Sequence, residues 1–253
     1  MRILLRMLAD ARVGTSGFAY RDWIGSVYPR GAGAGQLLPL YAQRLSCVEL
    51  TSTYARAPSP EQLASWAASV PPGFQFALKA PARISQELSS GKAAARALGQ
   101  FLDALEALGD RIGPLLIHVP ESMKADRRAL ASFLAAMPDG LRIAFDFRHP
   151  SWNDDATLRL LSDRDAALVL TDNGEGPPRL TLTAGFTYVR IRRDDEQAVT
   201  EWAERLGALA RRGVDVYAFL KHDRRGQAVD RALRLSSLLR AESEIGVEQA
   251  VLS

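Results

Sequence analysis

Short apolar runs alternate with longer segments of helical periodicity along nearly the whole chain, and this alternation most constrains the fold. Runs with the length and composition of buried strands lie at Arg12–Ser16, Ser46–Thr51, Phe74–Lys79, Pro114–Val119, Leu141–Phe147, Ala167–Thr171, Phe186–Ile191 and Val214–Leu220. Apolar residues recur at helical spacing in Pro60–Val70, Lys92–Leu108, Arg127–Met137, Thr157–Arg164, Gln197–Arg211 and Gln227–Arg240. Such alternation predicts parallel strands joined by helices. We therefore expect an α/β fold, a TIM-type (β/α)8-like barrel.

The composition is that of one ordinary globular domain. The chain has 253 residues, of which 47% are hydrophobic and 24% charged. No linker rich in Pro, Gly or Ser divides it, so we expect an N-terminal extension at 1–11 followed by a single barrel domain at 12–253. No GxGxxG motif follows the first strand, which counts against a dinucleotide-binding sheet.

Cysteine usage and hydropathy bear on location. The single cysteine, Cys47, lies in an apolar run, which predicts a buried and unreactive thiol and no internal disulfide. No segment approaches the roughly 20 apolar residues of a membrane span, and we find no export signal. These features predict a cytoplasmic protein. The net charge of +3 comes from arginines spread through the chain, so nucleic-acid binding is only weakly favoured.

Charged side chains gather where the predicted strands end. Examples are Glu49, Lys79, Asp146, Arg190 and Lys221, and all three histidines of the chain also lie at such ends. The carboxyl ends of parallel strands open on one face of a barrel, so residues far apart in sequence converge there. The pattern predicts one shared site.

The alternation of side chains along a strand indicates which residues face that site. Glu49 and Thr51 fall on one face of their strand, Asp146 and Arg148 on one face of theirs, and Arg190 on the same face as Arg192. The apolar residues between them are expected to meet the helices. Burying unpaired charges is costly, so the inward charges are expected to pair with one another or with a charged ligand.

Several ordered motifs resemble a known family. They are Gly14-Thr15-Ser16-Gly17-Phe18 with Trp23 downstream, Val48-Glu49-Leu50-Thr51-Ser52-Thr53-Tyr54, Phe76-Ala77-Leu78-Lys79, Phe145 to Trp152, and Tyr188-Val189-Arg190. In this order they are similar to motifs of the YecE-like proteins, the domain-of-unknown-function family 72. The resemblance covers the chain from about Arg12 onward and implies a TIM-barrel-like fold. It implies no established activity.

The chain also departs from the family pattern around the expected site. Relatives usually have Asn at Thr51, Gln at His118 and Glu at Asp146. They have His-Gly at Arg192-Arg193 and Asn-Asn at Lys221-His222. These departures imply that charged side chains bind the ligand in this protein, whereas amide side chains bind it in relatives. The residues that carry over best are Glu49, Lys79, Arg148, His149, Trp152 and Arg190.

The expected site suits a small anionic ligand. Guanidinium groups bind phosphate and carboxylate in a bidentate manner, and carboxylates or imidazole transfer protons near neutral pH. We expect a phosphorylated or carboxylated metabolite, sugar derivatives included, and an enzyme of the hydrolase or lyase type. The expected catalytic residues are Glu49, Asp146 and His149. The expected substrate-binding residues are Lys79, Arg148, Arg190, Arg192, Trp23, Tyr54, Trp152, His118 and Lys221.

Other interpretations of the same residues remain open. The charged residues could form a ring of ion pairs that closes the barrel, and Trp23 and Trp152 could pack loops rather than stack on a ligand. The protein could bind a metabolite or nucleic acid without catalysis, or use Lys79 as a Schiff-base nucleophile. A metal-dependent hydrolase is a further alternative, using ligands drawn from His118, His149, His222, Asp146, Asp172 and Asp223. The cofactor is left unassigned: the chain has no nucleotide-cofactor motif, and a metal is not favoured because the histidines form no HxH or HxxxH pair.

Overall fold

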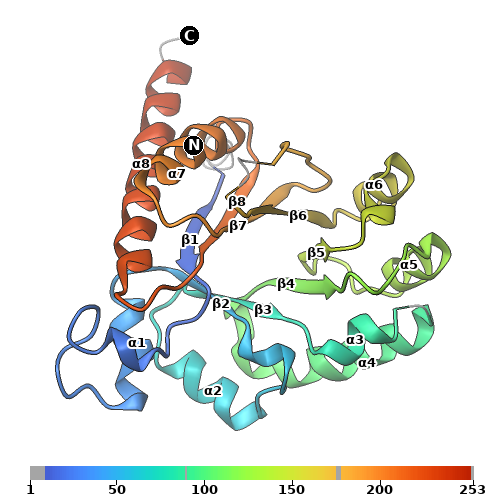
Figure 1. Ribbon diagram of the computed structural model, residues 1–253, viewed down its shortest axis with the longest axis horizontal. Coiled ribbons are helices and arrows are strands. Elements are labelled where there is room, and N and C mark those ends of the chain that lie inside the picture. The colour runs from blue at the N-terminus through green and yellow to red at the C-terminus, as the bar shows by residue number, and fades with distance from the viewer. Residues whose placement is uncertain (1–8, 89, 175–177, 252–253) are drawn as a thin grey trace. The chain divides into compact units, whose positions relative to one another are not determined.

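The computed structural model describes residues 9–88, 90–174 and 178–251, and within them strands and helices alternate as the sequence predicts (Figure 1). The strands are β1 (Ala11–Thr15), β2 (Cys47–Leu50), β3 (Gln75–Lys79), β4 (Ile112–Val119), β5 (Ile143–Phe147), β6 (Ala167–Asp172), β7 (Phe186–Ile191) and β8 (Asp215–Leu220). The α-helices are α1 (Leu37–Ala42), α2 (Pro60–Ala68), α3 (Ala82–Gln86), α4 (Gly91–Leu105), α5 (Arg127–Ala135), α6 (Asp155–Ser162), α7 (Glu196–Ala210) and α8 (Gln227–Val251). Short 3-10 turns occupy Arg21–Trp23, Ala34–Gln36, Ser52–Tyr54, Glu106–Arg111 and Pro150–Trp152.

The eight strands of the described residues form one sheet in the order β1-β8-β7-β6-β5-β4-β3-β2, with parallel pairing in every pair whose register is defined. This order and the intervening helices confirm the predicted TIM-type (β/α)8 architecture. The chain forms two compact units. Unit 1 comprises Met1–Val48, Leu170–Arg179 and Gly185–Ser253, and unit 2 comprises Glu49–Val169 and Leu180–Ala184.

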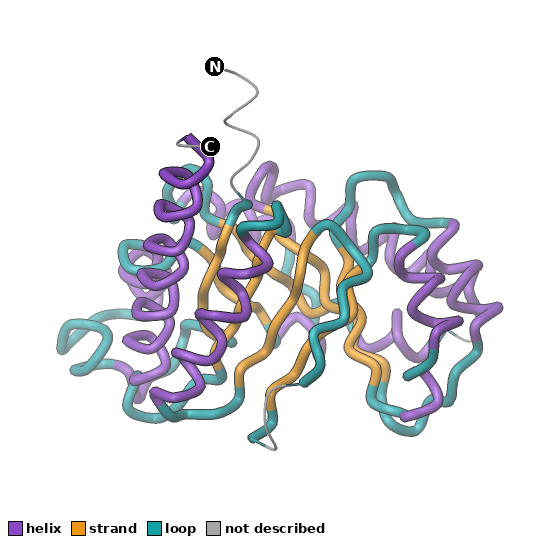
Figure 2. The backbone as a smooth tube through the Cα atoms, turned by 90° about the horizontal axis from the view of Figure 1, so that it is seen from above, coloured by secondary structure: helices purple, strands orange, loops and turns teal. Residues whose placement is uncertain are grey.

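In unit 1, β8 lies between β1 and β7. Leu220 on β8 is level with Thr15 on β1 and with Ile191 on β7, so these three strands end side by side. The helices α7 and α8 pack against each other, and both contact β8 (Figure 1). Figure 2 shows the long helix α8, which ends near the C label, running alongside the strands. The loops after β1, β7 and β8 therefore leave the sheet at neighbouring points.

In unit 2, β3, β4, β5 and the first half of β6 are neighbours. His118 on β4 is the register partner of Asp146 on β5, which places two predicted site residues on adjacent strands. Phe145, expected to face outward, meets Phe133 of α5 edge to face with ring centroids 6.1 Å apart. The side-chain alternation inferred from the sequence is thus confirmed on β5.

Aspartates begin several of the helices that follow the strands. Asp126, Asp154 and Asp195 each accept a hydrogen bond from the backbone N–H three residues later, at 2.9, 2.8 and 2.7 Å. Such N-caps satisfy an N–H group that the helix itself leaves unpaired. They fix where the chain turns from the carboxyl end of a strand into the returning helix.

Close backbone contact joins β1 to β2 within unit 1. A Cβ added at Gly14 would lie 2.2 Å from the carbonyl oxygen of Cys47. Tyr41 bridges the same strands: its hydroxyl accepts from the N–H of Thr15 at 2.9 Å and donates to the carbonyl of Cys47 at 3.0 Å. Burial raises the pKa of the Tyr41 hydroxyl, so it stays protonated and remains a donor.

Cys47 is fully buried on β2, which confirms its predicted burial. Burial also raises the pKa of its thiol, so little of the reactive thiolate forms at neutral pH. We expect the native protein not to react with 5,5′-dithiobis-(2-nitrobenzoate) within minutes, and the protein in guanidinium chloride to release one equivalent of chromophore. Rapid stoichiometric reaction of the native protein would contradict this prediction.

Two predictions of secondary structure are incomplete. The short helices α1 and α3 were not predicted, and α8 extends past its predicted end at Arg240 to Val251. The stretch 173–185, rich in Gly and Pro, contains neither helix nor strand in its described residues, and 175–177 lie outside the described part. None of the helices in the described part of the chain combines the length and hydropathy that a membrane span requires.

Candidate functional site

An imidazole, a carboxylate and a guanidinium group meet where β4 and β5 of unit 2 end. The Nδ1 atom of His118 lies 3.0 Å from Oδ2 of Asp146, and Nη2 of Arg148 donates to the same oxygen at 2.7 Å. The side chain of Asp146 is 4% exposed, whereas those of His118 and Arg148 are 21% and 26% exposed. Asp146 therefore anchors two more exposed basic groups, and the predicted pairing of inward charges holds for it.

Tyr54 and Lys79 extend this group. The Tyr54 ring meets the His118 ring edge on, with centroids 5.8 Å apart, and Nζ of Lys79 lies 3.7 Å from the centre of the Tyr54 ring. An ammonium over an aromatic face is a favourable cation–π arrangement. We call Tyr54, Lys79, His118, Asp146 and Arg148 the His118 cluster.

The loop after β2 is held in place by Thr53. Its buried hydroxyl lies 2.8 Å from the carbonyl oxygen of Leu50 and 2.6 Å from that of Lys79. It thereby ties the 3-10 turn Ser52–Tyr54 to the end of β3, and this turn carries Tyr54. Thr53 was not predicted as a site residue.

The His118 cluster has the parts of an acid–base site. A carboxylate at Nδ1 of a histidine fixes the ring and selects the tautomer whose Nε2 accepts a proton. Arg148 offers several donors in a fork that matches carboxylate or phosphate, and Lys79 adds a compact charge. The five side chains of the cluster thus bring together an imidazole, a carboxylate beside it, two cations and an aromatic ring.

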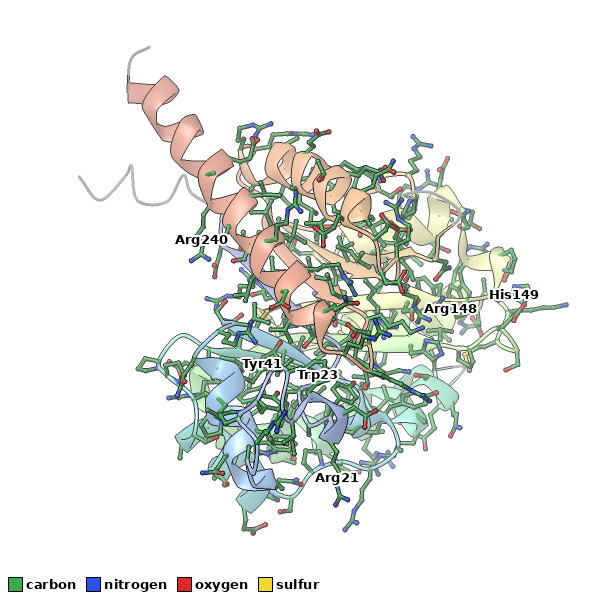
Figure 3. The ribbon with its side chains drawn as sticks, turned by 60° about the vertical axis from the view of Figure 1, so that its left-hand side comes forward. Arg21, Trp23, Tyr41, Arg148, His149 and Arg240 are labelled. Atoms are coloured by element: carbon green, nitrogen blue, oxygen red, sulfur yellow. The ribbon has the colours of Figure 1, made fainter. Side chains whose placement is uncertain are left out.

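Other predicted residues of unit 2 lie in different surroundings. Glu49 on β2 is fully buried. His149 begins the 3-10 turn Pro150–Trp152, where its Nδ1 accepts from the N–H of Ser151 at 3.1 Å and lies 2.8 Å from the Ser151 hydroxyl. Figure 3 labels His149 beside Arg148 in the segment that follows β5. Glu49 and His149 remain predictions as catalytic residues.

The two tryptophans predicted to bind ligand lie in packed surroundings. Trp152 of unit 2 is 2% exposed, stacks on Phe147 at 4.5 Å and donates from Nε1 to the carbonyl of Met123 at 2.9 Å. Trp23 of unit 1 is fully buried and donates to the carbonyl of Asp223 at 2.7 Å. Packing accounts for both side chains in the structure.

The predicted cations of unit 1 differ in exposure. Arg190 on β7 is 9% exposed, whereas Arg192 just beyond β7 and Lys221 just beyond β8 are exposed. The N–H of Lys221 donates to the carbonyl of Ile191 at 2.8 Å, so Arg192 and Lys221 begin neighbouring loops. Both remain candidates for binding an anion.

The loops after β1 and β8 meet through an aromatic stack. The rings of Tyr20 and His222 are 4.2 Å apart and within 14° of parallel. Burial lowers the pKa of His222 below its ordinary 6.5, the neighbouring Lys221 lowers it further, and Asp223 opposes the shift. Neutral imidazole is therefore favoured near pH 7.

The pKa of His222 sets an expected pH dependence. Since the folded pKa is depressed, the unfolded chain binds a proton more readily, and the contribution to stability falls as pH drops from about 6.5 through the folded pKa. We expect the His222 imidazole in a proton NMR titration to have a midpoint below 6.5, and Lys221→Gln to move that midpoint upward. A midpoint above 6.5 would contradict the packing described here.

A buried network around Asp172 was not predicted. Asp172, at the end of β6, is fully buried and its Oδ2 accepts from Nε of Arg193 at 3.0 Å and from Nε1 of Trp202 at 2.8 Å. Its Oδ1 accepts from the N–H of Gly174 at 3.1 Å. Arg193 also pairs with Glu201 on α7. This network fixes the start of the β7–α7 loop, where the chain departs from the family pattern.

Metal ligation was an alternative for the strand-end residues. In the described residues, no three His, Cys, Asp or Glu side chains form a group able to hold a metal ion. Asp172 binds Arg193 and Trp202, and Asp223 caps the start of α8.

A hollow of about 380 Å³ lies at the other end of the unit 2 strands. It is lined by the loops before β5 and β6, including Gly140, Arg142, Arg164 and Asp165. Since Ile143 begins β5 and Phe147 ends it, this hollow is at the opposite end of β5 from the His118 cluster. In barrel enzymes the chemistry occurs at the carboxyl end of the strands, which favours the cluster over the hollow.

The comparisons with known proteins agree with the motifs. The family profile described as "Protein of unknown function DUF72" matches residues 12–251. The UPF0759 protein YecE of Escherichia coli K12 is 28% identical over 139 residues, 53% of this chain and 51% of that protein. The chain thus spans about half the length of the curated relatives it matches.

Solved structures of DUF72 family proteins have the same fold. One from Thermotoga maritima MSB8 superposes with a TM-score of 0.77 at 26% identity, over 91% of this chain and 99% of the other. One from Enterococcus faecalis V583 has a TM-score of 0.69 at 18% identity, over 92% and 99% of the two chains. With its ordered motifs, its barrel fold and a profile match over most of its length, the chain belongs to the DUF72 family.

Proposed function

We propose that the protein is an enzyme that binds a small anionic metabolite at the His118 cluster and performs acid–base chemistry on it. The observation that carries the proposal is the contact of His118 Nδ1 with Asp146 Oδ2 at 3.0 Å, beside an arginine bound to the same oxygen. A histidine oriented by a buried carboxylate is a recurrent general base. The nearby cations supply the means to hold an anion.

The proposed roles follow from the geometry of each group. His118 removes a proton through Nε2, from water in a hydrolase or from a carbon beside the anionic group in a lyase. Asp146 positions the ring, and Arg148 and Lys79 hold the phosphate or carboxylate of the substrate. Glu49, buried on β2, is proposed as the general acid: in its protonated form it gives a proton to the leaving group, and it is reprotonated when His118 releases the proton that it took.

Ligand binding is tested with a thermal-shift screen of phosphorylated and carboxylated metabolites. A ligand at a hundredfold its dissociation constant should stabilise the protein by about 2.7 kcal/mol. We expect Arg148→Ala to abolish the shift and Arg148→Lys to reduce it, because lysine keeps the charge but lacks the fork. The control is Arg96→Ala, which removes an exposed arginine from α4. Equal loss of the shift in both alanine variants, or no metabolite hit, would contradict the proposal.

Catalysis is tested on the hits of that screen. We expect His118→Asn to lower kcat about 100-fold to 10,000-fold, the usual loss of a general base, while ligand binding persists. Asp146→Asn should lower kcat and alter the pH profile, because the ring loses its orienting charge. A ligand that binds at Arg148 but is never turned over by the wild type would identify a binding protein instead. If divalent metals stabilised the protein and turnover required them, the metal-dependent hydrolase would be favoured over the metal-free acid–base enzyme.

A further inference from the structure

The loop between β8 and α8 of unit 1 exposes basic side chains on a fixed backbone. Lys221, Arg224 and Arg225 are all exposed. The acid among them, Asp223, is occupied by capping α8: its carboxylate accepts from the N–H groups of Arg225 at 2.8 Å and Ala228 at 2.6 Å, among others. The charge of Asp223 is balanced by the buried Arg231 of α8, whose Nη2 lies 3.4 Å from Oδ2 of Asp223, so the exposed cations of the loop keep an excess of positive charge.

The loop is clamped against the loop after β1. The carbonyl of Asp223 accepts from Nε1 of Trp23 at 2.7 Å. Gly226 has φ +77°, and a Cβ there would lie 2.3 Å from Cγ2 of Val27, so only glycine fits. Because both loops are held together, the cations that they carry keep a defined spacing.

Neighbouring strand ends add further cations. Arg192 begins the loop beside Lys221, and Arg21 is exposed in the loop after β1 (Figure 3). We call the set the unit 1 basic rim; its members are Arg21, Arg192, Lys221, Arg224 and Arg225. Exposed acids in the same loops include Asp22, Asp194 and Asp195, and Asp195 also caps α7. The rim therefore has an excess of positive charge.

An aromatic face lies within this rim. His222 is exposed, and its ring stacks on that of Tyr20 at 4.2 Å. Tyr20 in turn packs against Trp23, with centroids 4.7 Å apart, and its hydroxyl donates to the carbonyl of Ser16. The imidazole is thus backed by a braced aromatic pair and offers a flat ring to a planar ligand.

We propose that the unit 1 basic rim binds single-stranded nucleic acid, with phosphates on the cations and a base stacked on His222. Cations spread over three loops fit a chain of phosphates better than one small anion. Unpaired bases can reach an aromatic platform, whereas the bases of a duplex are stacked inside it. The proposal uses residues of unit 1 and does not depend on the chemistry proposed for unit 2.

The proposal is tested by fluorescence anisotropy at two salt concentrations. The labelled oligonucleotides have about 12 nucleotides, a length within the usual site size. We expect single-stranded RNA or DNA to bind more tightly than a duplex of equal length. The double variant Arg224→Gln/Arg225→Gln should weaken binding about tenfold or more and reduce the salt slope by about 1.4, since each phosphate contact contributes about 0.7. The matched control is Arg212→Gln/Arg240→Gln, which removes two exposed arginines away from the rim and should change the dissociation constant less than about twofold.

Two substitutions separate stacking from charge. We expect His222→Ala to weaken single-strand binding about fivefold or more, the usual effect of losing one stacked base, and His222→Phe to retain it. Thermal melting of each variant verifies that the fold persists. The proposal would be overturned if no oligonucleotide bound at low salt or if the two double variants lost affinity equally. It would also be overturned if a duplex bound as tightly as a single strand, or if His222→Ala left the affinity unchanged.

Discussion

Replacing Gly14 by Ala is expected to lower the free energy of unfolding by about 3 kcal/mol or more, because overpacking of this kind costs 1–3 kcal/mol and sometimes more. The added Cβ would lie 2.2 Å from the carbonyl oxygen and 2.9 Å from the carbonyl carbon of Cys47. Both are backbone atoms of β2, so no side chain can rotate away to make room. We expect the melting temperature to fall by about 6–12 °C, using 2–4 °C per kcal/mol for a chain of this size.

The matched control is Gly99→Ala on α4. A Cβ at Gly99 meets nothing within 4 Å, and alanine is about 1 kcal/mol better than glycine inside a helix. We expect this variant to be unchanged or slightly more stable in urea denaturation. If Gly14→Ala were as stable as Gly99→Ala, the result would contradict the close packing of Gly14 on β1 against the backbone of Cys47 on β2.

Asp172→Ala is expected to cost about 3–5 kcal/mol, the usual effect of removing one partner of a buried ion pair. Asp172 is fully buried, and the substitution would leave Nε of Arg193 and Nε1 of Trp202 without their carboxylate. We expect a lower midpoint in urea denaturation and loss of the native tryptophan fluorescence environment at Trp202.

An exposed pair of the same kind provides the comparison. Asp230 accepts from Nη2 of Arg44 at 2.8 Å, but its side chain is 73% exposed. Exposed ion pairs contribute about 0–1 kcal/mol, so Asp230→Ala should be nearly silent. Similar losses in the two variants would show that burial does not determine the contribution of Asp172.

The strands could be predicted from sequence because burial on both faces leaves a strong pattern. β7 matches its predicted bounds Phe186–Ile191, and the other strands differ by a few residues at their ends. The helices α1 and α3 have six and five residues, too few for a 3.6-residue period to emerge. Their presence depends on packing in the folded chain, which the sequence does not display.

The candidate site was predicted in part. Strand parity placed Asp146 on an inward face and the end of a predicted strand placed His118 at the same site, and their register as neighbours on β4 and β5 gives the observed contact. The Tyr20–His222 stack and the network of Asp172 with Arg193 depend on loop conformation, and no periodicity reports the path of a loop. The sequence positions of the acidic residues could not indicate which carboxylates bind other residues of the protein, as Asp172 does, and which remain available to a ligand.

The most direct test of the anion site uses the three histidines as reporters. Imidazole proton resonances, assigned by substituting each histidine in turn, are followed while inorganic phosphate and then the best screened metabolite are added. We predict a saturable shift of the His118 resonance that is lost in Arg148→Ala, with smaller changes at His149 and His222. A His118 resonance that stays fixed at saturating ligand, or that shifts equally in Arg148→Ala, would contradict the account.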